Sequence, residues 1–396
     1  MDIATVTVPN FNHTSPTFRT FCGANSLSAL PRELDRLGVS RVVIFCGASL
    51  ERNVTALERI QAAIGGRLAG QFSGVQAHSP LPAVEAGRRF LKDVLADAVI
   101  AVGGGSAVVT ARAAAVLFAE GRDIRELCTQ RDANGTLFSP KLTSRKIPLW
   151  VVPSTPTTAY AKAGSAVLDP DTGERLALYD PKLRAQGIFL DPEVALTASL
   201  SLFRSSGLNA FSMAIEALLS GDDDPLADAS LIHALRMLIE WLPRLMESPE
   251  DVETRLRLML AALLCGEGTD HTGGSLAQGL AHAAGPRSSV ANGIVEVLLL
   301  PHAIRFIAPA AGEGVLRIGD ALGVSSQAAG TTLDKILTVL EGFLAAAEIP
   351  RQLRDVGIPR SALMEIADHA IDDWFLVRLP RRPSRNDILE LLERAW

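Results

Sequence analysis

The chain has 396 residues, of which 48% are hydrophobic, so it can bury a large core and is long enough for two domains. Its formal net charge of −6 at pH 7 offers no broad basic surface, which argues against nucleic acid or an anionic membrane as a partner. We therefore expect a small-molecule ligand, with no nucleic-acid partner and no membrane partner.

The cysteines and the N-terminus indicate a reducing, intracellular setting. Cys22, Cys46, Cys128 and Cys265 lie far apart and form no CxxC pair, which argues against a disulfide framework and against a thiolate zinc site. The first ten residues lack the basic and apolar segments of a secretory signal, and the alanine-rich stretch Ala261–Cys265 is far too short to span a bilayer. We predict a cytoplasmic protein.

The first half of the chain alternates short β-branched runs with helical patterns. Arg41–Cys46, Asp97–Val102 and Ile147–Val152 are predicted to be buried strands, because each is a short apolar run that ends at glycine or proline. Pro82–Ala96 has apolar positions at helical spacing. This order is typical of a parallel sheet with crossover helices that binds a nucleotide.

The second half is predicted to be helical. A short strand, Gly187–Leu190, gives way to a proline-initiated helix at Asp191–Pro192, where we place the domain boundary. The fold class is thus an α/β nucleotide-binding domain over residues 1–192 and an all-helical substrate domain over residues 193–396. The clearest helical patterns are Leu202–Leu219, Ala229–Met246, Thr254–Leu264 and Thr332–Ala347.

A glycine run follows the second predicted strand. Gly103, Gly104, Gly105 and Ser106 stand between this strand and a predicted helix, so backbone amides and the helix N-terminus can converge on a pyrophosphate. A plain tight turn is the alternative. The run is not the GxGxxG pattern of the ordinary Rossmann fold.

A second loop, Pro153–Thr158, follows the next strand and carries four hydroxyl groups and two prolines. Its position at the carboxyl end of a strand predicts a second phosphate or ribose contact. Taken alone, such a loop is more often only a turn.

In the helical half, two residue pairs spaced four apart share a helix face. Asn209 pairs with Met213 and Gln278 with His282, while Asn292 precedes Gly293. A metal site needs His, Asp, Glu or Cys at such positions, and here only His282 is one of these. The spacing of a metal site is present without its chemistry, and we expect no metal.

Two histidines are candidate acids or bases. His282 would otherwise be a hydrogen-bonded structural histidine, and His271, which follows Asp270, would otherwise lie in an exposed surface loop. The residues alone leave these alternatives open.

The order of these motifs resembles the iron-containing alcohol dehydrogenase superfamily, which has the dehydroquinate synthase-like fold, and is most similar to its maleylacetate reductases. The resemblance covers nearly the whole chain. It rests on Phe21–Leu27, Leu34–Gly38, Ala77–Pro80, Gly103–Ser106, the Pro153 loop, Asp191–Pro192, Ser206–Ala217, Leu280–His282, Leu299–His302 and Leu379–Leu389.

The resemblance implies cofactor contacts for particular residues. The pyrophosphate loop falls on Gly103–Ser106, the turn near the nicotinamide on Ser79–Pro80, and a Gly-x-Lys motif on Gly173–Arg175. The threonine-rich cofactor loop falls on Ser154, Thr155 and Thr158. NAD or NADP is the implied cofactor, and the choice stays open because no carboxylate stands near Gly47. A homodimer is also implied.

The resemblance also implies where a metal would bind. Metal-dependent members hold iron or zinc with one aspartate and three histidines, and these positions fall on Asn209, Met213, Gln278 and Asn292. All four differ from the ligands. His282 matches a further histidine placed near nicotinamide and substrate.

These observations predict a metal-independent NAD(P)-dependent reductase or dehydrogenase that transfers hydride to a ketone or enone oxoacid. His282 would supply the proton, and Asn209, Gln278 and Asn292 would stabilise the developing alkoxide. One alternative is a lyase, isomerase or cyclase of specialised metabolism on the same fold, with His282 or His271 as acid and base. Another is a binding protein without catalysis.

Overall fold

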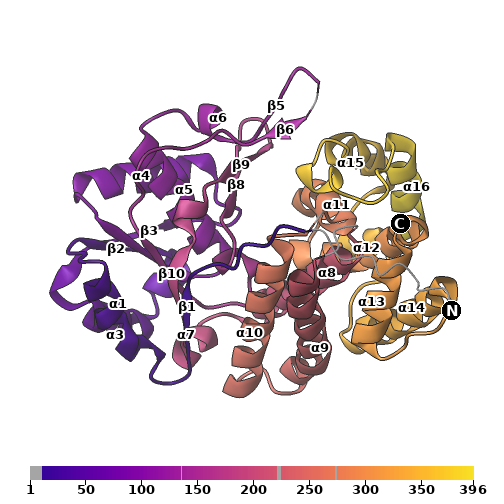
Figure 1. Cartoon of the computed structure of the whole chain (residues 1–396), viewed down its shortest axis with the longest axis horizontal. Coiled ribbons are helices and arrows are strands. Elements are labelled where there is room, and N and C mark those ends of the chain that lie inside the picture. The colour runs from indigo at the N-terminus through magenta and orange to yellow at the C-terminus, as the bar shows by residue number, and fades with distance from the viewer. Residues whose placement is uncertain (1–10, 135, 221–223, 273) are drawn as a thin grey trace, which may run out of the picture. The chain divides into compact units, whose positions relative to one another are not determined.

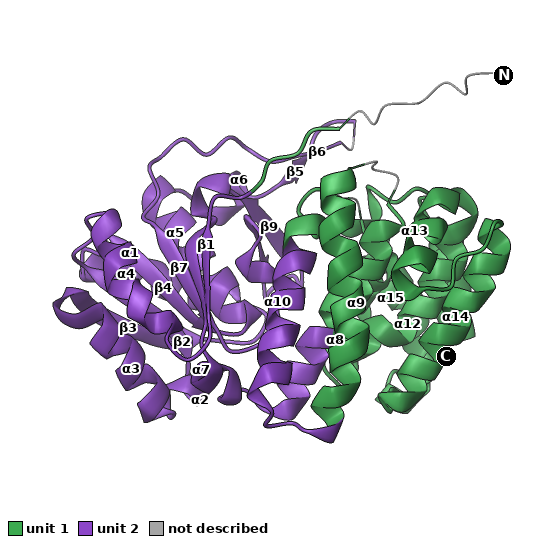
Figure 2. Cartoon of the chain, turned by 60° about the horizontal axis from the view of Figure 1, so that its bottom comes forward, with its two compact units in different colours: residues 1–15, 208–246, 267–396 green, residues 16–207, 247–266 purple. Residues whose placement is uncertain are grey.

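The computed structural model describes residues 11–134, 136–220, 224–272 and 274–396. The first ten residues, in which we saw no secretory signal, lie outside this part. The chain forms two compact units (Figure 2). The sheet unit contains residues 16–207 and 247–266, and the helical unit contains residues 11–15, 208–246 and 267–396. Since each unit combines separate segments, the boundary expected at residue 192 stays a prediction.

A parallel sheet of six strands organises the sheet unit (Figure 1). The strand order is β1-β10-β7-β4-β2-β3, and every neighbouring pair is parallel. The predicted strands around Val43, Ile100, Val151 and Ile188 are confirmed. The strands are β1 (Arg19–Cys22), β2 (Val42–Gly47), β3 (Leu68–Val75), β4 (Ala98–Gly103), β7 (Leu149–Pro153) and β10 (Ala185–Leu190).

Helices cover both faces of this sheet. On one face, Ile44, Ile100 and Trp150 are buried in a single apolar cluster with side chains of α1 and α3. On the other, Gly87 of α4 lies against Phe45 and Ala114, which explains why a glycine stands inside this helix. The helices that lie wholly or mostly in the sheet unit are α1 (Leu30–Arg36), α2 (Ala48–Glu51), α3 (Val54–Ile64), α4 (Leu81–Asp93), α5 (Gly105–Glu120), α6 (Ile124–Leu127), α7 (Pro192–Leu196) and α10 (Val252–Thr269).

The two edge strands and two small hairpins are not predicted by the sequence pattern. Strand β3 is only half-buried along its length and includes glycine and glutamine, and β1 is largely exposed, so neither has the continuous apolar run of a central strand. The hairpins are β5 (Gln130–Arg131) with β6 (Leu137–Phe138) and β8 (Gly164–Leu168) with β9 (Arg175–Tyr179).

The helical unit contains no named strand among its described residues. The division between the units falls within α8, and the helices predicted around Ala214, Leu238 and Leu340 are confirmed. The helices are α8 (Leu200–Leu218), α9 (Pro225–Glu247), α11 (Leu276–Ala284), α12 (Asn292–Ile307), α13 (Gly312–Leu322), α14 (Ala329–Ala346), α15 (Leu363–Ala370) and α16 (Arg385–Ala395).

Helix α12 is the most apolar of these helices. The segment Asn292–Ala310 has the length and hydropathy of a membrane span, but 67% of it is buried inside the folded chain. A helix that is apolar on all sides and buried by its neighbours is typical of a protein core. One carboxylate, Glu296, interrupts this apolar surface and is 1% exposed.

Candidate functional site

The glycine run forms the turn between β4 and α5. Gly103 ends the strand with φ of +133°, a conformation that side-chain-bearing residues rarely adopt, and Gly104 is the N-cap of the helix. The first backbone N–H groups of α5 have no partner within the helix and carry its positive dipole end. This turn has the geometry that a pyrophosphate requires.

The hydroxyl loop packs directly against this turn. The Ser154 amide donates to the Gly103 carbonyl at 3.0 Å. A Cβ atom on Gly104 would lie 3.2 Å from Thr155 Oγ1, and one on Gly105 would lie 2.9 Å from Thr157 Oγ1. At both positions a side chain would crowd a threonine hydroxyl, and glycine avoids this contact. Thr158, the last hydroxyl-bearing residue of the loop, begins the short 3-10 helix Thr158–Tyr160.

The hydroxyl of Thr155 is buried and has no hydrogen-bond partner among the described residues. A buried hydroxyl without a partner is costly, and a ligand oxygen at the glycine turn would satisfy it. Thr157, which the sequence analysis did not select, lies equally close to the glycines. The sequence signal that could have identified Thr157 was its position in the same hydroxyl-rich loop.

A third loop lies beside the glycine turn in the sheet unit. His78 and Ser79 both have positive φ, of 63° and 50°, and Ser79 Oγ donates to the Ser106 carbonyl at 3.1 Å. The Leu168 amide donates to the Ser79 carbonyl at 3.2 Å, and Leu168 pairs with Arg175 across the β8–β9 hairpin. Arg175 also lies 3.3 Å from His78 Nδ1. These contacts thus join Ser79 to the glycine turn and join the β8–β9 hairpin, which carries Arg175, to Ser79.

A buried arginine ties α5 to the segments behind this site. The guanidinium of Arg112, which is 1% exposed, donates to the carbonyls of Ala159 at 2.9 Å, Gly164 at 2.6 Å and Leu183 at 3.3 Å. These acceptors belong to the end of the hydroxyl loop, the β8 hairpin and the turn before β10. The glycine turn and the hydroxyl loop are therefore held by one side chain.

In the helical unit, Asn209 and Glu296 form a polar contact between α8 and α12. Asn209 Nδ2 donates to Glu296 Oε2 at 2.5 Å. The sequence analysis did not select Glu296, although a single carboxylate in an apolar helix was a signal. It adds an acidic group beside one of the predicted catalytic amides.

Gln278 lies near the N-terminus of α11, and that terminus is capped by a carboxylate from α8. Glu216 accepts hydrogen bonds from the amides of Leu276 at 2.7 Å and Ala277 at 3.0 Å, and from the hydroxyl of Ser275. Asn209, Met213 and Glu216 share one face of α8 by their spacing. This face therefore meets the start of the helix that carries Gln278 and His282. Gln278 Oε1 is buried without a hydrogen-bond partner among the described residues.

Burial raises the pKa of Glu216 to about 7, against the lowering effect of the Ser275 hydroxyl and the helix amides. Because the folded-state pKa is raised, the fold favours the protonated form. The contribution of Glu216 to the free energy of unfolding is fully present below pH 4.5. It is lost as the pH rises to about 7, a loss of up to roughly 3 kcal/mol.

We expect the free energy of unfolding to fall over this range in the wild type and to fall less in Glu216→Gln. Urea denaturation at several pH values measures the free energy of unfolding of both proteins. The same dependence on pH in wild type and Glu216→Gln would contradict the assignment to Glu216.

His282 is fixed by a carboxylate and two aromatic rings. Its Nδ1 lies 2.8 Å from Asp373 Oδ2, and its ring lies 5.7 Å from the Trp374 ring and 5.6 Å from the Phe375 ring, between centroids. Asp373 also caps the short helix Trp374–Leu376, so its own position is set by the backbone. With Nδ1 engaged by Asp373, Nε2 is the nitrogen that can exchange a proton with a substrate.

The positions on which the resemblance places a metal carry side chains that do not fit a divalent iron or zinc ion. Asn209 directs its amide nitrogen at Glu296, and Met213 presents a thioether that is 4% exposed. Asn292 Oδ1 fills the space above Gly285, where a Cβ atom would lie 2.0 Å from it. Neutral amides and a thioether supply neither the charge nor the imidazoles that such ions need.

His271 lies in a different group of side chains from His282. Its ring stacks on that of His13 at 3.9 Å between centroids. Burial lowers the pKa of His271, and the neighbouring His13 lowers it further. The catalytic role predicted for His271 stays a prediction.

Two family models match the chain in succession. The first, described as iron-containing alcohol dehydrogenase, matches residues 16–192. The second, described as the C-terminal part of the Fe-containing alcohol dehydrogenase family, matches residues 203–396.

Characterised relatives match over nearly their whole length. Maleylacetate reductase 2 of Cupriavidus pinatubonensis is 29% identical over 381 residues, covering 96% of this chain and 94% of its own. Lactaldehyde reductase of Escherichia coli is 26% identical over 382 residues, covering 94% and 97%.

Solved structures share the fold. The alcohol dehydrogenase from Oenococcus oeni superposes with a TM-score of 0.88 at 20% identity, covering 98% of this chain and 100% of its own. The maleylacetate reductase from Rhizobium sp. strain MTP-10005 has a TM-score of 0.78 at 24% identity, covering 98% and 99%.

Proposed function

Because the chain belongs to the iron-containing alcohol dehydrogenase family, we propose that it is an NAD(P)-dependent reductase that acts on a ketone or enone oxoacid without a catalytic metal. The substrate class follows from its similarity to maleylacetate reductases over almost the full chain. The observation that carries the proposal is the His282–Asp373 pair, a positioned proton donor that needs no metal.

The sheet unit supports nucleotide binding. A helix N-terminus, an unpartnered Thr155 hydroxyl and the tied Ser79 loop converge around Gly104. These groups would bind the two phosphates and orient the nicotinamide ring, which supplies the hydride when bound.

The helical unit supports proton transfer. When hydride adds to a carbonyl carbon, negative charge develops on its oxygen and must be stabilised by hydrogen-bond donors. The amides of Asn209, Gln278 and Asn292 can stabilise it, and protonated His282 can donate the proton from Nε2. Asp373 would hold the ring and fix its tautomer through Nδ1.

An activity assay with chelator-treated protein tests this proposal. The protein is mixed with NADH or NADPH and with maleylacetate or related oxoacids, and nucleotide absorbance is followed. We expect oxidation that persists in chelator and is not increased by added Fe²⁺ or Zn²⁺. Activity that appears only after metal is restored would contradict the metal-free mechanism.

The buried Glu296 carboxylate favours a second candidate function. Together with His282 it provides two titratable groups, which suffice for a lyase, isomerase or cyclase that moves protons without net redox change. This function predicts tight nucleotide binding without oxidation of NADH or NADPH by any oxoacid. Isothermal titration with each nucleotide, run beside the activity assay, separates the two functions.

A further inference from the structure

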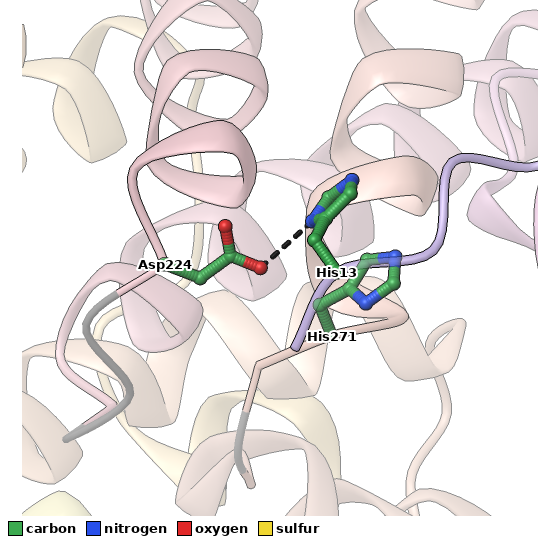
Figure 3. Close-up of side chains that lie close together, drawn as sticks. All are labelled: His13, Asp224 and His271. Atoms are coloured by element: carbon green, nitrogen blue, oxygen red, sulfur yellow. Dashed lines mark hydrogen bonds and ion pairs between the residues drawn. The ribbon is translucent and has the colours of Figure 1, made fainter. Parts of the chain in front are cut away.

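A second cluster of chemically active side chains lies in the helical unit and includes neither the His282–Asp373 pair nor the Asn209–Glu296 pair. His13 comes from the segment of residues 11–15, Asp224 directly precedes α9, and His271 follows α10 (Figure 3). Each offers one ligand atom, and these atoms all lie within 4.8 Å of one another. His13 Nδ1 is 2.7 Å from Asp224 Oδ2.

The cluster is held in place by its surroundings. The side chains of His13 and Asp224 are 14% and 5% exposed. The second carboxylate oxygen of Asp224 accepts the amides of Leu226 at 3.0 Å and Ala227 at 3.2 Å, so the helix N-terminus fixes the direction of Oδ2. The ligand atoms are therefore presented on a short, inflexible carboxylate and on two rings that stack on each other.

One atom of the cluster lacks a partner that it needs. Nε2 of His271 is buried and makes no hydrogen bond within the part of the chain that the structure describes. A buried ring nitrogen without a partner is costly, and a bound cation would satisfy it. This observation is independent of the clustering and points to a ligand.

The charge around the two imidazoles also favours a cation. Glu267 acts electrostatically on His13, and Asp270 acts on His271. Two neutral imidazoles and a carboxylate form a donor set suited to first-row divalent ions, with positions left open for water.

We propose that His13, Asp224 and His271 bind a divalent transition-metal ion, with Zn²⁺ as the expected occupant, and that the ion fastens residues 11–15 to the helical unit. Two ligand atoms on a tetrahedral zinc ion with bonds of about 2.1 Å lie about 3.4 Å apart. The three ligand atoms lie within 4.8 Å of one another, and His13 Nδ1 lies 2.7 Å from Asp224 Oδ2, so side-chain rotations must adjust these distances when the ion binds. This site does not involve Asn209, Met213, Gln278 or Asn292.

Metal titration of the full chain tests the proposal. Protein stripped with chelator and dialysed is titrated with ZnCl₂ by calorimetry, and with CoCl₂ by visible absorption. We expect one equivalent of Zn²⁺ to bind and Co²⁺ to give the spectrum of a low-coordinate site with nitrogen ligands. His13→Ala and His271→Ala should each weaken binding by about 100-fold or more, since each removes a direct ligand.

Matched variants separate this site from others. His233→Ala removes an exposed histidine of α9, and Gln278→Ala alters a position that the family uses for its metal; both should bind Zn²⁺ as the wild type does. The proposal would be overturned if His13→Ala and His271→Ala each bound Zn²⁺ as tightly as the wild type. Loss of Zn²⁺ binding in Gln278→Ala would also overturn it. Circular dichroism of each variant confirms that it is folded.

Hydrogen exchange provides a readout that does not depend on affinity. Zn²⁺ should slow exchange of amides in residues 11–15 of the wild type and leave them unchanged in His271→Ala. Protection that is the same in both proteins would show that the ion does not fasten this segment through His271. This test is independent of the reductase proposal, because it uses neither nucleotide nor oxoacid.

Discussion

Replacing His282 by alanine is expected to lower kcat for oxoacid reduction by about 10²–10⁴-fold, the usual contribution of a positioned general acid. Binding of NADH or NADPH should change little, because the predicted nucleotide contacts all lie in the sheet unit. Steady-state kinetics and isothermal titration on the same preparations measure the two effects. A variant that keeps near wild-type kcat would exclude His282 as the proton donor.

The partner of His282 supplies a companion test. Asp373→Asn preserves size but can turn an amide N–H, rather than a carboxylate oxygen, toward His282 Nδ1. Its kcat should be reduced, because the carboxylate that fixes the ring and its tautomer through Nδ1 is lost. His233→Ala, on an exposed position of α9, is the matched control and should behave as the wild type.

A methyl group on Gly105 is expected to weaken NADH and NADPH binding by about tenfold or more, equivalent to roughly 1.4 kcal/mol. The new Cβ atom would lie 2.9 Å from Thr157 Oγ1, so the Thr157 side chain must shift from its place beside the turn. Isothermal titration of Gly105→Ala measures the loss.

Gly66→Ala is the control for this variant. It places the same methyl group in the same unit, where no atom lies within 4 Å. We expect wild-type nucleotide affinity for Gly66→Ala. Equal affinity for Gly105→Ala and wild type would mean that the nucleotide does not depend on the contact between these loops.

The sheet unit was largely predictable because its signals are local. A buried strand, a glycine stop and a helix follow one another around Gly103, and the same order recurs around Gly47. Each signal is continuous along the chain, so period and turn chemistry suffice to predict it. The half-buried edge strand β3 lacked such a pattern and was missed.

The helical unit was predictable as helices but not as a site. Glu216 reaches Leu276 over 60 residues, Asn209 reaches Glu296 over 87, and His282 reaches Asp373 over 91. Spacing along one helix identifies the residues on a face but not the carboxylate that a different helix brings to it. The proposed zinc site could not be predicted from spacing for the same reason, because His13 and Asp224 are 211 residues apart.

The three carbonyls that Arg112 holds have a consequence for the thermodynamics of ligand binding. Because this buried guanidinium joins α5 to the segments at Ala159, Gly164 and Leu183, the amides and hydroxyls around the glycine turn are ordered before a nucleotide arrives. The loss of conformational entropy on binding would therefore fall on the nucleotide rather than on the protein.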